Sequence, residues 1–146
     1  MKFPYGRYET EPVPSAPDAW MIYRPVIPVR FIGTAGDAVF YGLLDTGADD
    51  TLITQEMVEA LGVVSDPESS VKMLSASGEF LVRYGAVTIE LQQARESYRW
   101  PAVVGIVGRP WREALLGHSG FLRYFDVTFF GENREVRLRR NKVATL

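Results

Sequence analysis

Short apolar segments separated by turn residues recur through most of this chain, and no other feature restricts its fold as strongly. The strand-like segments are 26–32, 39–44, 71–74, 80–84, 87–91, 100–107, 127–130 and 136–138. Turn residues at 33–37, 75–78 and 131–133 separate three pairs of these segments, which predicts three β-hairpins. The run 100–107 is almost continuously apolar, as expected for a strand buried on both faces.

One segment instead has the pattern of a short helix. Thr54 can cap its N-terminus, and Gly62 can end it. Between them, Met57, Val58 and Leu61 recur at the spacing of an apolar helix face. The sequence therefore predicts an all-β fold with one or two short helices, in which the strands form either a sandwich or a closed barrel.

The first 24 residues differ from the rest of the chain. Prolines occupy positions 4, 12, 14 and 17 within them. Proline fixes φ and donates no backbone hydrogen bond, so we expect an extended, proline-rich N-terminal arm with little regular structure. We predict that residues 1–24 form this arm and that residues 25–146 form a single folded domain.

The overall composition excludes several classes of protein. The chain has 146 residues, a net charge of −2, no cysteine and one histidine, His118. Disulfides, thiolate zinc sites and cysteine nucleophiles are therefore excluded, as is a two-histidine metal site within one chain. We expect no metal and no cofactor. The near-neutral charge gives no field that would attract nucleic acid or an anionic membrane, so we expect neither as a partner.

No segment has the pattern of a membrane span or a secretory leader. The longest apolar stretch, around residues 102–107, is far too short to cross a bilayer. The first twelve residues are polar and lack the apolar core of a signal peptide. We therefore expect a soluble, cytoplasmic protein.

The large aromatic residues are interpreted as core: Trp100, Trp111, Phe121, Phe125, Phe129 and Phe130.

The most informative segment is Leu43–Leu52, with the sequence LLDTGADDTL. It places Asp45 at the end of an apolar strand, where a turn begins. Gly47 allows the backbone to approach the carboxylate closely, and the Thr46 hydroxyl can lock the turn through side-chain-to-backbone hydrogen bonds. A plain surface turn is the alternative, because Asp, Thr and Gly are all common in turns. The two leucines argue against it, since they draw the aspartate toward the core.

A second motif, ALLG at residues 114–117, follows about seventy residues later. Together, the two motifs resemble those of the retroviral-type aspartic proteases, the retropepsin-like family, over roughly residues 25–140. This resemblance implies a closed, mainly antiparallel barrel in which each subunit contributes one Asp-Thr-Gly and two subunits build one active site. It also implies that the later apolar strand packs under the catalytic loop and that residues 75–78 form a flap.

The resemblance implies roles for individual residues. The expected catalytic residues are Asp45, Thr46 and Gly47. The expected substrate-binding residues are Ala48, Asp49, Asp50, Leu52, Ser75, Ala76, Ser77, Gly78 and Leu115. The residues expected to support the catalytic loop are Leu116, Gly117 and His118. Because His118 stands where the family usually has arginine, we expect its imidazole to lie near Asp49 and to pair with it at mildly acid pH.

The activity implied by the resemblance is that of an aspartic endopeptidase. Two carboxylates about 3 Å apart share one proton, so one can activate water while the other donates to the scissile carbonyl. Since the chain has one such aspartate, this implies a homodimer with Asp45 from both subunits and a peptide or protein substrate. The alternative is a non-catalytic retropepsin-like module that binds extended peptides by strand addition. The intact Asp-Thr-Gly favours the enzyme.

Overall fold

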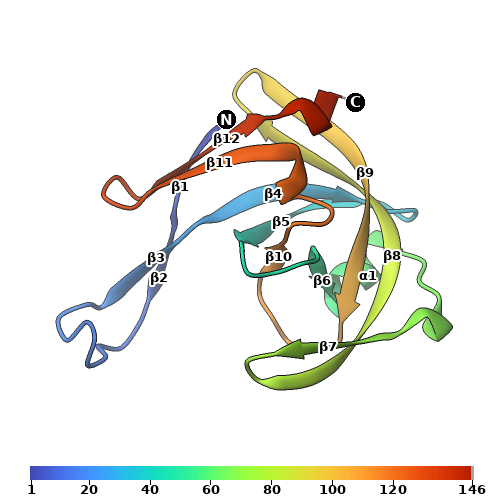
Figure 1. Ribbon diagram of the computed structural model, residues 1–146, viewed down its shortest axis with the longest axis horizontal. Helices are drawn as coiled ribbons and strands as arrows, with labels where there is room; N and C mark the ends of the chain where they lie inside the picture. The colour runs from blue at the N-terminus through green and yellow to red at the C-terminus, as the bar shows by residue number, and fades with distance from the viewer. Residues whose placement is uncertain (146) are drawn as a thin grey trace.

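The computed structural model describes residues 1–145, which consist mainly of β-strands, with one α-helix (Figure 1). The strands are β1 (Lys2–Pro4), β2 (Gly6–Glu9), β3 (Met21–Arg24), β4 (Val26–Ile32), β5 (Asp37–Leu44), β6 (Leu52–Thr54), β7 (Val71–Ser75), β8 (Gly78–Gln93), β9 (Glu96–Val107), β10 (Ala114–Leu116), β11 (Phe125–Phe130) and β12 (Glu135–Arg140). The helix is α1 (Gln55–Leu61), and the short 3₁₀-helices are η1 (Pro67–Ser69), η2 (Leu122–Tyr124) and η3 (Lys142–Thr145). No helix within residues 1–145 is long and apolar enough to span a membrane.

Six strands form a closed ring of hydrogen bonds. Their order is β4-β5-β10-β6-β9-β8, and β4 pairs with β8 to close the ring. The pairs β5–β10 and β6–β9 are parallel, and the other four junctions are antiparallel. The prediction of an all-β, mainly antiparallel closed barrel is confirmed. The three predicted hairpins also form, as β4–β5, β7–β8 and β11–β12.

Strand β8 is longer than the sequence pattern indicated. The predicted segments 80–84 and 87–91 lie on this one strand, because β9 pairs with it without a break from Arg83 to Gln93. In Figure 1 the two strands sweep together around one side of the ring. The expectation that 100–107 is buried on both faces holds only for its end: Val103 is 60% exposed, whereas residues 104–107 are buried.

The predicted helix is confirmed, and its two ends match the predicted caps. The Thr54 hydroxyl accepts a hydrogen bond from the Met57 backbone N–H at 3.3 Å. Gly62 ends the helix with φ of +66° and donates its N–H to the Val58 carbonyl at 2.8 Å. This left-handed conformation favours glycine. Met57, Val58 and Leu61 turn inward and are buried.

An aromatic cluster fills much of the core. Trp100 is 3% exposed; its ring stacks on Tyr98 at 4.8 Å between centroids and meets the edges of Phe121 and Phe125 at 5.5 Å. Its indole N–H donates to the Gly120 carbonyl at 2.8 Å, so the one polar atom of this side chain is satisfied. The core assignment is wrong for Phe129, which shares the core-facing side of β11 with Phe125 but lies near the far end of the strand and is 40% exposed.

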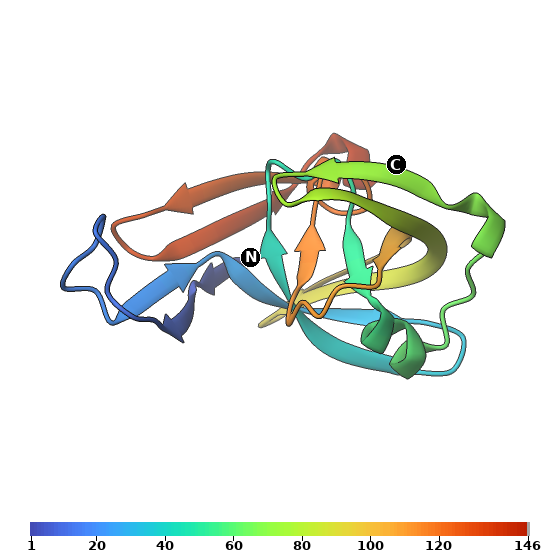
Figure 2. The same cartoon turned by 90° about the horizontal axis from the view of Figure 1, so that it is seen from below.

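The first 24 residues are more regular than predicted. Strand β1 pairs with β12 in a sheet ordered β1-β12-β11, and Phe3 on β1 is buried in the main core. Strands β2 and β3 form a separate two-stranded sheet that projects away from the ring (Figure 2). The expectation of little regular structure here is wrong, because three of the four prolines fall in the connection between β2 and β3 and the fourth ends β1. The domain boundary at residue 25 stays a prediction.

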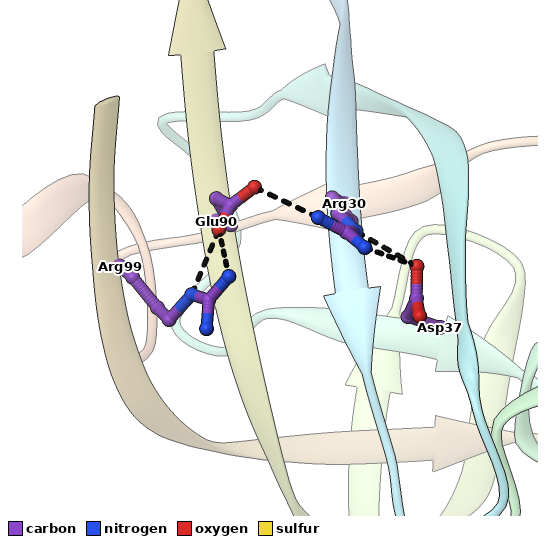
Figure 3. A network of polar contacts seen from close by, with 4 residues as sticks. All are labelled: Arg30, Asp37, Glu90 and Arg99. Carbon is purple, nitrogen blue, oxygen red and sulfur yellow. Dashed lines mark hydrogen bonds and ion pairs between the residues drawn. The ribbon is translucent and has the colours of Figure 1, made fainter. Parts of the chain in front are cut away.

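A network of charged side chains holds the seam where β4 meets β8 (Figure 3). Glu90 on β8 is 7% exposed and accepts hydrogen bonds from Arg99 at 2.7 Å and from Arg30 at 3.2 Å. Arg30 also pairs with Asp37 at 2.7 Å. The bond from Arg99 is the main reason that the pKa of Glu90 lies below its ordinary value. Both arginines stand directly opposite Glu90 on neighbouring strands, so the network joins β9, β8 and β4.

Candidate active site

Asp45 stands at the start of the loop that joins β5 to β6. Its Oδ1 atom accepts a hydrogen bond from the Gly47 N–H at 2.9 Å, and its backbone carbonyl accepts from the Ala48 N–H at 3.2 Å. Its own N–H donates to the Leu116 carbonyl at 3.2 Å. These bonds fix the carboxylate on a tight turn, where it is half-buried rather than fully exposed. Thr46 and Gly47 on this turn are exposed, so the turn lies at the surface while its aspartate is partly buried.

Strand β10 supports this loop from behind. It lies between β5 and β6, parallel to β5, with Leu115 opposite both Leu43 and Leu52. The next residue after the strand, Gly117, lies so close to the loop that an added Cβ would sit 2.2 Å from the Asp50 carbonyl oxygen. Only glycine permits this approach. The placement agrees with the supporting role expected for Leu116 and Gly117.

Backbone hydrogen bonds on both sides of Gly117 tie the two loops together. The His118 N–H donates to the Ala48 carbonyl at 2.9 Å, and the Ser119 N–H donates to the Asp49 carbonyl at 2.7 Å. The Thr51 hydroxyl donates to the Ser119 carbonyl at 2.8 Å. The loop that carries Asp45 is therefore anchored along its length by a segment about seventy residues away in sequence.

The expected pairing of His118 with Asp49 is wrong. The imidazole Nε2 atom lies 3.0 Å from the Thr46 carbonyl oxygen, and since a carbonyl only accepts, the ring donates this bond. No ion pair joins it to Asp49 in the described part of the chain. The histidine side chain is shorter than an arginine side chain, and its imidazole binds the backbone of the adjacent loop instead. His118 therefore still contacts the loop that carries Asp45, but through a neutral acceptor.

A cleft of about 790 Å³ opens beside Asp45. Ten of the residues predicted for the site line it: Asp45, Gly47, Ala48, Asp49, Asp50, Leu52, Ser75, Ala76, Ser77 and Leu115. Thr46 and Gly78 were predicted for the site but do not line the cleft. The structure thus brings together the loop after β5, strand β10 and the tip of the β7–β8 hairpin, which are far apart in sequence.

Five residues of the cleft were not predicted: Met73, Leu74, Phe80, Arg109 and Trp111. Trp111 was interpreted as core, but it is only half-buried and its ring packs edge-on against Phe80 at 6.4 Å between centroids. The alternation of β7 and β8 could have indicated Met73 and Phe80, since both lie opposite each other in the hairpin. Residues 108–113 have no regular pattern, so nothing in the sequence indicated Arg109.

The hairpin tip is a two-residue turn. Ser75 pairs with Gly78 across it, and Gly78 has a φ of +110°, a conformation that side chains rarely adopt. The Ser75 hydroxyl donates to the Gly78 carbonyl at 3.1 Å. Figure 1 shows the hairpin extending past the ring. The geometry at this tip explains why glycine follows the turn.

The charges in the cleft are unevenly distributed. Asp45, Asp49 and Asp50 come from a single loop, and Arg109 is the one basic side chain in the lining among residues 1–145. The Tyr84 hydroxyl donates to Asp50 Oδ2 at 2.7 Å. Burial, and then this hydrogen bond, raise the pKa of Tyr84 to about 12, so it remains a neutral donor at ordinary pH. No group of three or more metal-ligating side chains forms within the described residues.

The chain matches a protein-family model and solved structures, but no curated protein. A family described as "Aspartyl protease" matches residues 27–118. Among solved structures, the chain is similar to the EIAV protease complexed with the inhibitor HBY-793, at 24% sequence identity and a TM-score of 0.39. That similarity covers 59% of this chain and 82% of the viral protease chain.

Proposed function

Because this chain belongs to the aspartyl protease family, in its retropepsin-like form, we propose that it is an endopeptidase whose active site contains Asp45 from each of two identical subunits. The observation that carries the proposal is the position of Asp45, which is fixed by Gly47 and Leu116 at the edge of a large cleft. The cleft offers apolar surface from Leu52, Leu115 and neighbouring residues to a peptide chain.

A second identical subunit supplies the carboxylate that the mechanism needs. Peptide hydrolysis by aspartates requires two carboxyl groups about 3 Å apart that share one proton. Asp49 and Asp50 lie on the same loop as Asp45. The Tyr84 hydroxyl already donates to the carboxylate of Asp50, and the Gly47 N–H donates to the carboxylate of Asp45 rather than to either of theirs. A twofold dimer brings the two Asp45 side chains together at the symmetry axis.

In this dimer, the ionised Asp45 accepts a proton from water, and the protonated Asp45 donates to the scissile carbonyl oxygen. The water oxygen attacks the carbonyl carbon, and the proton then passes to the leaving nitrogen as the C–N bond breaks. The two carboxyl groups titrate as a pair, so activity depends on two apparent pKa values that belong to neither subunit alone. Thr46 and Gly47 shape the turn, and residues 75–78 close over the bound peptide as a flap.

The test of catalysis is the substitution Asp45→Asn. The amide can neither share nor relay the proton, so we expect loss of peptide-library cleavage with the fold intact. Asp18→Asn is a matched control, because Asp18 is exposed and lies outside the cleft. Retained cleavage in the Asp45→Asn protein contradicts the aspartic mechanism, and peptide binding without any cleavage by the wild-type protein indicates the non-catalytic module instead.

The shared site is tested by mixing subunits. When wild-type and Asp45→Asn chains are mixed in equal amounts and allowed to exchange, only dimers with two wild-type chains are active. Activity should therefore fall to about a quarter of the unmixed value at equal total protein. A fall to one half, with the active species sedimenting as a monomer, contradicts a site built from two subunits.

A further inference from the structure

Arg109 occupies an unusual position in the cleft. It follows β9, in the loop 108–113, and its Nη1 atom donates to the Ser77 hydroxyl at 2.9 Å. Its guanidinium carbon lies 4.9 Å from the centroid of the Phe80 ring. Both contacts are with the β7–β8 hairpin, so this hairpin determines where the guanidinium lies.

The charge of Arg109 has no anionic partner among the residues that the structure describes. No carboxylate within residues 1–145 forms an ion pair with it. The Ser77 hydroxyl, which accepts from its guanidinium, is neutral. A guanidinium has five N–H donors in a planar fork that matches a carboxylate, so most of its donors remain available.

The contacts of Arg109 also orient it in advance of binding. The cation–π contact with the Phe80 ring and the hydrogen bond to Ser77 together restrain the guanidinium. Phe80 in turn packs edge-on against Trp111, which helps to hold the ring in place. Because a hydrogen bond between charged groups is roughly twice as strong as one between neutral groups, a carboxylate is a better partner than Ser77.

We propose that Arg109 is a specificity-determining residue, which binds an aspartate or glutamate side chain of the peptide in the cleft. This inference rests on the peptide-cleaving function proposed above. In a twofold dimer each subunit contributes one Arg109. The preference for an acidic residue should therefore occur at two positions of the substrate, one on each side of the scissile bond and at equal distance from it.

The test measures peptide binding rather than cleavage, in the full-length Asp45→Asn protein. Pairs of peptides that differ only by glutamate or glutamine at one position, scanned along the peptide, are titrated by calorimetry. At the position that reaches Arg109, glutamate should bind about tenfold more tightly than glutamine. The difference should shrink at high salt, because the contact lies in an open cleft.

Variants of Arg109 connect this preference to its side chain. Arg109→Gln should abolish the preference, and Arg109→Glu should reverse it in favour of lysine at the same position. Arg112→Gln is the matched control: Arg112 lies in the same loop, is exposed and does not line the cleft, so the preference should remain. Circular dichroism and thermal unfolding establish whether each variant is folded. Loss of the preference in Arg109→Gln and its reversal in Arg109→Glu are separate results, so either variant tests the proposal if the other does not fold.

Three results overturn the inference: equal binding of every glutamate and glutamine pair, a glutamate preference that survives Arg109→Gln, or no measurable binding by any peptide of the set. Failure of the proposed catalysis is distinguishable from these, because it appears as absence of cleavage by the wild-type protein. A glutamate preference that depends on Arg109, found without cleavage, leaves Arg109 as the specificity determinant of a binding cleft.

Discussion

Gly117 lies in close contact with the backbone of the loop that carries Asp45, and the substitution Gly117→Ala tests how much the site depends on this contact. The added Cβ would lie 2.2 Å from the Asp50 carbonyl oxygen and 2.7 Å from the Ala48 carbonyl oxygen, where ordinary contact begins at 3.4 Å. Both neighbours are backbone atoms, so no side chain can move aside. The strand end that carries Gly117 and the loop that carries Asp45 must therefore separate by about 1 Å.

The cost of this separation follows from what it disturbs. Overpacking of this kind destabilises a fold by about 1–3 kcal/mol. The hydrogen bonds from His118 and Ser119 to the loop lie on either side of the clash, and weakening them adds about 1 kcal/mol. We expect a total of about 3 kcal/mol, which corresponds to a fall in Tm of about 10 °C for a domain of this size.

The effect on activity should be larger than stability alone explains. A displacement of about 1 Å at a catalytic group can reduce the rate about 100-fold. Thermal unfolding and peptide cleavage at a temperature where both proteins are folded separate the two effects. Gly131→Ala is the control, because no atom lies within 4 Å of its Cβ, and it should change stability by less than about 0.5 kcal/mol. A Gly117→Ala protein with wild-type Tm and activity would refute the reasoning.

Two further predictions concern stability. Glu90 has a folded-state pKa below its unfolded value. Its contribution to the free energy of unfolding is therefore present above the unfolded pKa, about 4.3, and is lost as pH falls through the folded pKa. In urea unfolding, Glu90→Gln should therefore be less stable than wild type at pH 7, and the difference should vanish in acid; a constant difference contradicts this. Thr54→Ala should cost about 1 kcal/mol by removing the hydrogen bond that caps α1, with Thr54→Ser restoring most of it.

The parts of the fold that the sequence predicted correctly are those set by local chemistry. Turn residues and alternating strands identify the hairpins, and Thr54 and Gly62 mark the ends of α1 because each cap depends on a few neighbouring residues. The loop at Asp45 was recognisable for the same reason. Its carboxylate is bound by Gly47, two residues away.

The parts that were missed depend on partners far away in the sequence. Strand β1 is only three residues long and forms because β12 lies beside it, which no local pattern indicates. Arg109 reaches the cleft because the ring brings the loop after β9 next to the β7–β8 hairpin. The side chain of His118 contacts the Thr46 carbonyl, a backbone acceptor that no residue type in the sequence identifies.

The position of β10 also has a consequence for the order in which the protein folds. This strand pairs with β5 through Ala114 and Gly42, 72 residues apart, and the ring closes through Ile32 and Thr88, 56 residues apart. Contacts between such distant residues form slowly, because chain entropy is lost before they stabilise anything. Until β10 docks, Asp45 lacks its hydrogen bond to the Leu116 carbonyl, and its loop lacks the close contact with Gly117. A refolding chain should thus acquire its hairpins and helix well before it acquires an ordered carboxylate at Asp45, and the peptidase activity proposed above should return only in the last kinetic phase.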